Sequence, residues 1–346
     1  MKKVLSILLV TSLLASIMIT SAAYADKPGD SQEQDGIQIL KKAPPKDLRG
    51  VISGLEQSGL AKWRKSFSSS DAPAGFVGAP VRGERYAVVI GINDYPGQGS
   101  VLEGGLDLFY AVADTEAVFN MLVGIKGFKP ENVIMLTDRS ATKSSVLDQI
   151  KALKKKVNRG DEVVFYFSGH SAQYTGKPSN TGSFGLWKSG IVVWADDLNE
   201  TAPAVVWDKE LKTAFTGFKT DRIIFGFDCC YAGGFSNLAG LGGIVVMASE
   251  ADGISGEYGE AYADIGMGPL PDIGWLNQGL FTYFFVVQGL TWGVPEMLNP
   301  QDGITTIEEA FYYAQPILTG FTQQAQGMGL DEIPVMRDWF YGDLDL

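Results

Sequence analysis

Side chains suited to nucleophilic chemistry follow two apolar stretches of the sequence. The stretch 223–227 leads through one acid into Cys229 and Cys230, the only cysteines among 346 residues. The stretch 163–167 leads through a serine and a glycine into His170, the only histidine. A thiol beside an imidazole forms a cysteine–histidine dyad, in which the imidazole activates the thiol and transfers its proton. For either residue alone, a buried structural cysteine or a hydrogen-bonded core histidine is the alternative interpretation.

Alternating strands and helices are expected to position these residues. Apolar, β-branched runs predict strands at 86–92, 132–136, 161–167, 223–227 and 243–247. Apolar residues at helical spacing predict helices at 107–123, 142–157, 209–215, 280–287 and 307–318, with Thr142 as the cap of the second. This alternation predicts an α/β fold with a mainly parallel sheet and helices on both faces. Functional groups of such sheets lie beyond the carboxyl ends of strands, where Cys230 and His170 fall.

Charge limits the kinds of partner that the protein can bind. The net charge of −12 argues against general nucleic-acid binding. Acidic residues are concentrated in 231–346, which contains 15 Asp and Glu and one basic residue, Arg337. A solvated acidic surface accounts for this bias. The alternative is an electric field that attracts cationic substrates or Ca²⁺.

Residues 1–25 have the pattern of a secretory signal peptide. Two lysines precede an uncharged apolar stretch, and residues 23–25 form a small-x-small cleavage site. An uncleaved membrane anchor is the alternative. No later stretch is long and apolar enough to span a membrane. We therefore expect a secreted protein, extracellular or periplasmic, with no membrane span after signal removal.

The stretch 26–84 is polar and contains Pro- and Ser-rich segments, which predicts a partly disordered leader or pro-segment. Regular strand and helix patterns begin at Arg85, so 85–346 is the expected globular domain. Within it, the Gly-, Ser- and Asn-rich stretch 177–184 predicts a surface loop.

The motifs around the candidate residues resemble those of caspase-like cysteine peptidases, and most closely the metacaspase branch. In that family one strand ends in Ser-Gly-His-Gly and a second ends in Asp-x-Cys. Here the corresponding sequences are SGHS at 168–171 and DCC at 228–230. The spacing of 60 residues between His170 and Cys230 compares with about 50 in caspases.

This resemblance is to the secreted prokaryotic type of metacaspase-like protein, and it implies a three-layer caspase-like fold. The expected domain has a large-subunit-like part at 85–235 and a small-subunit-like part at 236–346. It implies an endopeptidase with His170 and Cys230 as catalytic residues, because the family places its nucleophile two residues after the Asp. The backbone N–H groups of Ser171 and Cys230 are the expected oxyanion donors. A free thiol has a pKa of about 8.5, so His170 is expected to promote the thiolate. No cofactor is required for this chemistry.

The resemblance also implies a pocket for the side chain before the cleaved bond. Asp228 lies where that pocket forms, and an acid there favours Arg or Lys by charge pairing. Similarity to metacaspases adds Asp114 and Ser168 to the pocket. The expected substrate is a peptide or protein with Arg or Lys before the cleaved bond. The alternatives are a strand-end turn cap for Asp228 and a solvated helix position for Asp114.

Metacaspases often need Ca²⁺, so the resemblance implies Ca²⁺ as an activator. The residues that lie where the family has ligand acids are Asp196, Asp197, Asp208 and Glu210. Solvated loop acids are the alternative.

Ser171 departs from the family pattern, which has Gly after the histidine. The departure is costly if the turn there requires a positive φ. It supports an alternative function: a catalytically inactive caspase-fold binding module whose acidic C-terminal third recruits a cationic partner.

Overall fold

The structure is a computed structural model, and it describes residues 77–96, 99–100, 105–173, 189–197, 199, 203–265, 274–298, 302–324 and 332–346. The expected signal peptide at 1–25, most of the expected leader and the expected loop at 177–184 lie outside these residues. None of the described helices is both long and apolar enough to cross a membrane.

A six-stranded sheet forms the centre of the fold, in the order β11-β8-β7-β3-β1-β2. Its strands are β1 (Arg85–Gly91), β2 (Val133–Thr137), β3 (Glu162–Ser168), β7 (Ile223–Asp228), β8 (Ile244–Met247) and β11 (Val335–Asp338). All neighbours pair in parallel except β11, which pairs antiparallel with β8 at the edge. The predicted, mainly parallel sheet is confirmed.

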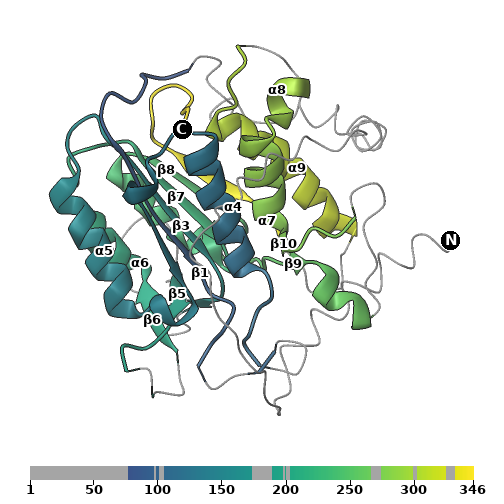
Figure 1. Ribbon diagram of the computed structural model, residues 1–346. Helices are drawn as coiled ribbons and strands as arrows, with labels where there is room; N and C mark the ends of the chain where they lie inside the picture. The colour runs from purple at the N-terminus through teal and green to yellow at the C-terminus, as the bar shows by residue number, and fades with distance from the viewer. Residues whose placement is uncertain are drawn as a thin grey trace.

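Helices cover both faces of the sheet and give three layers (Figure 1). One face carries α4 (Ala111–Gly124), α7 (Leu280–Thr282), the π-helix η6 (Tyr283–Thr291) and α9 (Ile307–Gln324), with α8 (Val294–Leu298) beside them; the other carries α5 (Lys143–Lys156) and α6 (Asp208–Phe215). Successive strand residues serve the two faces in turn. In β1, Val88 belongs to the core that contains Val146 of α5, and Val89 to the core that contains Val118 of α4.

Two small sheets lie outside the central one, and the hydrophobic pattern did not predict them. One is antiparallel and contains β4 (Ser171–Gln173), β5 (Ser189–Val193) and β6 (Ala204–Trp207). The other pairs β9 (Glu257–Tyr258) with β10 (Gln278–Gly279). Both adjoin residues that matter for the site, because β4 begins directly after His170 and β10 ends directly before α7.

Side-chain hydrogen bonds to the backbone explain where two helices begin. Thr142 caps α5 as predicted, since its hydroxyl accepts the backbone N–H of Ser145 at 3.2 Å. The helix predicted from residue 107 begins only at Ala111. The carboxylate of Glu257 accepts the N–H groups of Phe109 and Tyr110, at 3.0 and 2.9 Å, and so serves the entry to α4 from another segment.

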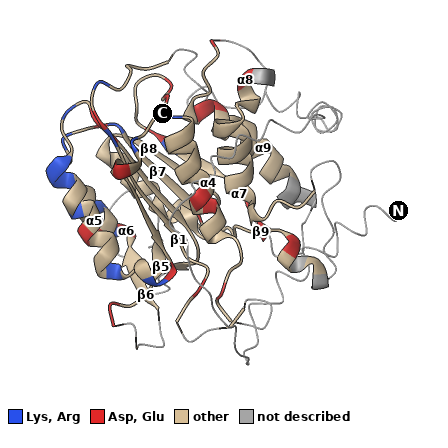
Figure 2. Ribbon diagram, viewed as in Figure 1, with Lys and Arg blue, Asp and Glu red and all other residues tan. Residues whose placement is uncertain are grey.

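The charge bias of the sequence is visible on the ribbon. Figure 2 shows Lys and Arg along α5, whose last turn contains Lys154, Lys155 and Lys156. Helices α7, α8 and α9 contain neither Lys nor Arg. Among the α-helices of the described chain, Lys and Arg therefore occur on the face of the sheet that carries α5 and α6.

Candidate active site

The strand register brings the two candidate catalytic residues to one edge of the sheet. Ser168, the last residue of β3, pairs with Asp228, the last residue of β7. His170 and Cys230 each lie two residues beyond this pair. The hydroxyl of Ser171 donates a hydrogen bond to the Cys230 carbonyl oxygen and ties the two strand ends together. The sequence analysis placed each residue beyond the end of a strand, and the register brings these two strand ends side by side.

The His170 imidazole is half-buried and is held by a backbone carbonyl. Its Nε2 lies 2.7 Å from the Leu106 carbonyl oxygen. A carbonyl only accepts, so Nε2 carries the proton and Nδ1 of the neutral ring is the acceptor. Burial lowers the pKa of His170, and the hydrogen bond to Leu106 opposes that effect. The neutral ring is therefore the favoured form at neutral pH.

The two thiols differ in burial. Cys229 is 2% exposed and lies in the core, as strand alternation predicted. Cys230 is half-buried, and its Sγ lies 3.7 Å from the Ser255 carbonyl oxygen. Burial raises the pKa of Cys230 to about 11. The expected resting thiolate is thus not favoured; the thiol and imidazole are both neutral, and each has a carbonyl as its partner.

The backbone at Ser171 suits an oxyanion donor. Val192 donates its N–H to the His170 carbonyl at 2.9 Å, so the His170 carbonyl points toward β5. Ser171 lies opposite Ile191, in the next pair, so its own N–H points away from β5. Ser171 is not among the residues with positive φ, so serine fits this position without strain. The positive φ, +151°, occurs two residues earlier, at Gly169.

The expected pocket residues form a buried acidic group. The Ser168 hydroxyl donates to Asp114 Oδ2 at 2.7 Å, and the Gly279 N–H donates to Asp114 Oδ1 at 2.8 Å. Asp114 and Asp228 are 1% and 5% exposed. A Cβ added to Gly279 would lie 2.4 Å from Asp228 Oδ2 and 2.7 Å from Asp114 Oδ2, so both carboxylates border this glycine. Ser168, Asp114 and Asp228 are therefore brought together.

Burial raises the pKa of both carboxyl groups. For Asp114 the nearby charge of Asp228 raises the pKa further, against the hydrogen bonds from Ser168 and Gly279. For Asp228 burial is opposed by hydrogen bonds from Thr282 and Ser255. Neither acid is paired with a cation among the described residues. A cationic group that entered this site would lower both pKa values and stabilise the ionised forms.

Three further residues of the site were missed by sequence reasoning: Ser255, Thr282 and Glu332. The Ser255 hydroxyl donates to Asp228 Oδ1 at 2.7 Å, and Thr282 donates to Oδ2 through its N–H and its hydroxyl, at 3.0 and 2.6 Å. Glu332 is fully buried and accepts the N–H of Gly256 at 2.9 Å. Burial and then Asp228 raise its pKa well above the usual range. Ser255 and Glu332 lie in irregular segments, where no periodicity marks them.

The four acids expected to bind Ca²⁺ have separate partners. Asp196 accepts the N–H of Ser144, and Asp197 accepts from Asn199. Asp208 accepts from Asn237, and Glu210 forms an ion pair with Lys143 at 2.8 Å. Within the described ranges, no group of three or more His, Cys, Asp or Glu side chains is arranged to hold a metal ion. These residues do not form a fitting site here, so Ca²⁺ activation stays a prediction and no catalytic step uses it.

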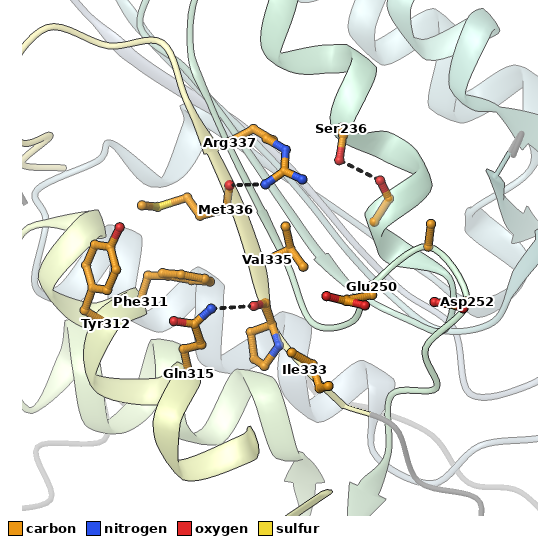
Figure 3. Close-up of a pocket in the computed structure, with 13 residues that line it drawn as sticks. Ser236, Glu250, Asp252, Phe311, Tyr312, Gln315, Ile333, Val335, Met336 and Arg337 are labelled. Atoms are coloured by element: carbon orange, nitrogen blue, oxygen red, sulfur yellow. Dashed lines mark hydrogen bonds between the residues drawn. The ribbon is translucent and has the colours of Figure 1, made fainter. Parts of the chain in front are cut away.

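A cavity of about 430 Å³ lies behind the turn that follows Cys230 (Figure 3). Gly233 borders it on the side of that turn, and Glu250 and Asp252 line one wall. Helix α9 and strand β11 form the opposite wall, where Gln315 donates to the Pro334 carbonyl at 2.9 Å. Neither His170 nor Cys230 lines this cavity, so it is separate from the candidate dyad.

Comparison with known proteins relates part of this chain to one family. Residues 85–239 match the family model described as "Metacaspase, peptidase C14 domain". Metacaspase-1 of Candida glabrata is 29% identical over 126 residues, which are 35% of this chain and 30% of that protein. Metacaspase-1 of Kluyveromyces lactis is 34% identical over 97 residues, 26% of this chain and 21% of that protein. The chain thus spans less than a third of the length of these curated relatives.

A solved structure, protein GSU0716 from Geobacter sulfurreducens, superposes with a TM-score of 0.45 and 15% identity, over 76% of this chain and 97% of that one. A likeness at this level says nothing about function. The mainly parallel sheet with helices on both faces has the architecture of a caspase-like α/β domain. Within that class, residues 85–239 are similar to the metacaspase family.

Proposed function

We propose that the protein is a cysteine endopeptidase that uses Cys230 and His170. The observation that carries the proposal is the β3–β7 register, which places a thiol and an imidazole two residues beyond one strand pair, beside a buried acidic group. The metacaspase family match of residues 85–239 supports it.

The reaction starts from a neutral thiol and a neutral imidazole. His170 Nδ1 accepts the thiol proton as Cys230 Sγ attacks the peptide carbonyl carbon. The N–H groups of Ser171 and Cys230 stabilise the resulting oxyanion. The imidazolium then donates its proton to the leaving amine, which breaks the C–N bond and leaves a thioester. Water, deprotonated by His170, hydrolyses the thioester to a carboxylic acid and regenerates the thiol.

The test of this chemistry compares the two cysteines. Cys230→Ala should abolish cleavage of a fluorogenic Arg peptide, because no nucleophile remains. Cys229→Ala should keep most of the activity, because Cys229 lies in the core at 2% exposure. The measurement is kcat/KM, with circular dichroism as the control for folding. Equal loss of activity in the two variants would remove the assignment of the nucleophile.

We further propose that the substrate has Arg or Lys before the cleaved bond. Asp114 and Asp228 are buried at the site and lack a cationic partner in the described chain, and an Arg or Lys side chain would supply one. Asp228→Asn should lower kcat/KM for Arg peptides at least about tenfold, since a charge-assisted hydrogen bond is worth about 1.5–3 kcal/mol. An Asn amide can still serve Thr282 and Ser255, so the free energy of unfolding should change by about 1 kcal/mol or less.

The specificity test is the ratio of kcat/KM for Arg and Ala peptides in parent and variant. A variant that keeps the parental preference for Arg would contradict the pocket.

The rival function is a binding module without turnover, and its main support was Ser171 in place of Gly. Ser171 is not among the residues with positive φ, so the backbone there does not disfavour serine. A thiol-reactive probe separates the two functions, because a binding module should show no fast labelling that depends on Cys230.

Export completes the proposal. The pattern of residues 1–25 supports cleavage after Ala25 and release outside the cytoplasm. N-terminal sequencing of protein recovered from the culture medium or periplasm tests this step.

We also propose Ca²⁺ as an activator of the peptidase. An activity assay with and without added Ca²⁺ tests this, and equal rates would contradict activation by the metal.

A further inference from the structure

We propose that Tyr95 and Asp107 form a clamp that positions the His170 imidazole in its Nε2–H tautomer. The kinetic consequence of the clamp rests on the proposed peptidase function, whereas its effect on the tautomer does not. Neither residue touches the substrate in this proposal, so both are positioning residues.

Tyr95 holds His170 in two ways. Its hydroxyl oxygen accepts the backbone N–H of His170 at 2.8 Å, and its ring lies 5.0 Å from the imidazole, tilted by 39°. The tyrosine is 1% exposed and burial raises its pKa, so the hydroxyl stays protonated. The close approach explains Gly169, where a Cβ would lie 2.7 Å from the Tyr95 hydroxyl oxygen.

Asp107 connects Tyr95 to the carbonyl that orients the ring. Its Oδ1 accepts the Tyr95 N–H at 2.8 Å, and the preceding residue, Leu106, supplies the carbonyl that lies 2.7 Å from His170 Nε2. Asp107 therefore links Tyr95, whose hydroxyl binds the His170 backbone, to Leu106, whose carbonyl binds the His170 side chain.

The clamp is anchored to the rest of the domain at both ends. Asp138 Oδ1 accepts the N–H groups of Asn93 and Asp94, at 2.8 and 2.9 Å, just before Tyr95. Leu108, just after Asp107, donates its N–H to the Asn93 carbonyl at 2.8 Å. The two anchors fix the distance between Tyr95 and Leu106, so the imidazole is held from its backbone side and from Nε2 by one segment.

The consequence concerns Nδ1. With Nε2–H directed to Leu106, Nδ1 is the lone-pair nitrogen that remains for the thiol proton. Loss of the Tyr95 hydroxyl leaves the His170 N–H without its partner, and loss of the Asp107 carboxylate releases the Leu106 carbonyl. In both cases the ring gains access to the other tautomer, and the fraction of molecules with Nδ1 ready to accept a proton falls.

The experiment uses the full chain without a histidine tag, labelled with ¹⁵N-histidine. The sequence has one histidine, so the two imidazole nitrogens of His170 give the only signals. The parent should show the Nε2–H tautomer above its pKa. Tyr95→Phe and Asp107→Ala should show a mixture of tautomers, and kcat should fall about tenfold, roughly the effect of one lost buried hydrogen bond, with KM within about twofold. Asp107→Asn retains an acceptor oxygen and should restore the parental spectrum.

Two control variants remove equivalent hydrogen bonds elsewhere. Tyr110→Phe deletes a hydroxyl that accepts the Ala261 N–H at 2.7 Å, and Asp161→Ala deletes a carboxylate that accepts the Glu84 N–H at 2.8 Å. Both should keep the parental tautomer. A parental tautomer in Tyr95→Phe would overturn the clamp, and this variant, which keeps the ring, decides the matter if Asp107→Ala does not fold. A parent that shows the Nε2–H tautomer but no turnover would contradict the peptidase function, and the tautomers of the variants would still decide for or against the clamp.

Discussion

At the scale of single residues, burial determines how the candidate dyad works. The Cys230 thiol and the His170 ring each face a backbone carbonyl, and none of the ion pairs of the described residues involves either group. Burial disfavours the charged form of both groups, so it raises the pKa of Cys230 and lowers the pKa of His170. The proton should therefore move only as the substrate carbonyl is attacked, with His170 as a general base rather than as one half of a resting ion pair.

This state predicts the pH dependence of activity. His170 accepts a proton only when neutral, and burial lowers its pKa, so the acid limb of kcat/KM should lie below the ordinary value of about 6.5. Rates for an Arg peptide between pH 4 and 8 measure the limb. An acid limb above pH 6.5 would mean that the pKa of the required neutral imidazole is raised in the free enzyme, which would contradict the effect of burial.

The same group predicts a trend in stability. The unfolded chain takes up a proton on its histidine as the pH falls through about 6.5, before the folded protein does. The contribution of His170 to the free energy of unfolding is therefore fully present above pH 6.5 and decreases as the pH falls toward the folded pKa. Urea unfolding of the parent and His170→Gln at pH 7.5 and 5.5 isolates this contribution. The difference between the two proteins should shrink at the lower pH.

At the scale of secondary structure elements, Gly279 joins the two halves of the acidic site. It is the last residue of β10 and directly precedes α7. Its N–H donates a hydrogen bond to Asp114, and the N–H of Thr282 in α7 donates one to Asp228. Its φ of −59° is open to any residue, so the requirement for glycine is one of space. Under the proposed preference for Arg or Lys, a cationic side chain would have to reach the two carboxylates beside Gly279.

Gly279→Ala should therefore act as a plug. The new methyl carbon would lie 2.4 and 2.7 Å from carboxylate oxygens of Asp228 and Asp114, which must shift. Overpacking of this kind costs about 1–3 kcal/mol of stability, and KM for Arg peptides should rise more than kcat falls. Gly320→Ala in α9 is the matched control, because its Cβ would meet no atom within 4 Å. Unchanged KM in Gly279→Ala would place the pocket elsewhere.

The sequence predicted five of the six strands of the central sheet and missed the edge strand β11. Strands β3 and β7 were the clearest because they are buried on both faces. All seven residues of β3 and all six of β7 are buried, so each appears as a continuous apolar run that ends at a polar residue. The antiparallel sheet β4-β5-β6 escaped prediction because its strands are short, and β4 has three residues. Ser255 and Glu332 escaped for another reason: tertiary contacts alone bring their irregular segments to Asp228 and Gly256.

At the scale of the whole molecule, charge and connectivity constrain how the protein can process itself. A peptidase that cleaves after Arg or Lys needs such a residue at the cut. The stretch from Tyr231 to Met336 contains none, so the two halves of the domain should remain covalently joined. Basic residues occur instead upstream of β1 and at its first residue, and they include Lys41, Lys42, Lys46, Arg49, Lys62, Arg64, Lys65, Arg82 and Arg85.

The structure separates these sites into two groups. Val77 to Arg85 packs on the domain: Gly78 donates its N–H to the Asp343 carbonyl at 2.7 Å, and Gly83 donates to the Gly160 carbonyl at 3.0 Å. The Arg85 guanidinium lies 3.5 Å from the carboxylate of Glu162, which is fully buried. A cut after Arg82 or Arg85 would have to detach these contacts first, whereas a cut before Val77 leaves them in place.

We therefore predict that self-processing removes residues upstream of Val77 and stops there. Intact mass and N-terminal sequencing of active protein should give one chain that starts after a basic residue between Lys41 and Lys65. Cys230→Ala, purified in parallel, should keep the longer N-terminus, because it has no nucleophile to make the cut. A self-generated break between Tyr231 and Met336 would refute both this route and the preference for Arg or Lys on which it depends, since no such residue is available there.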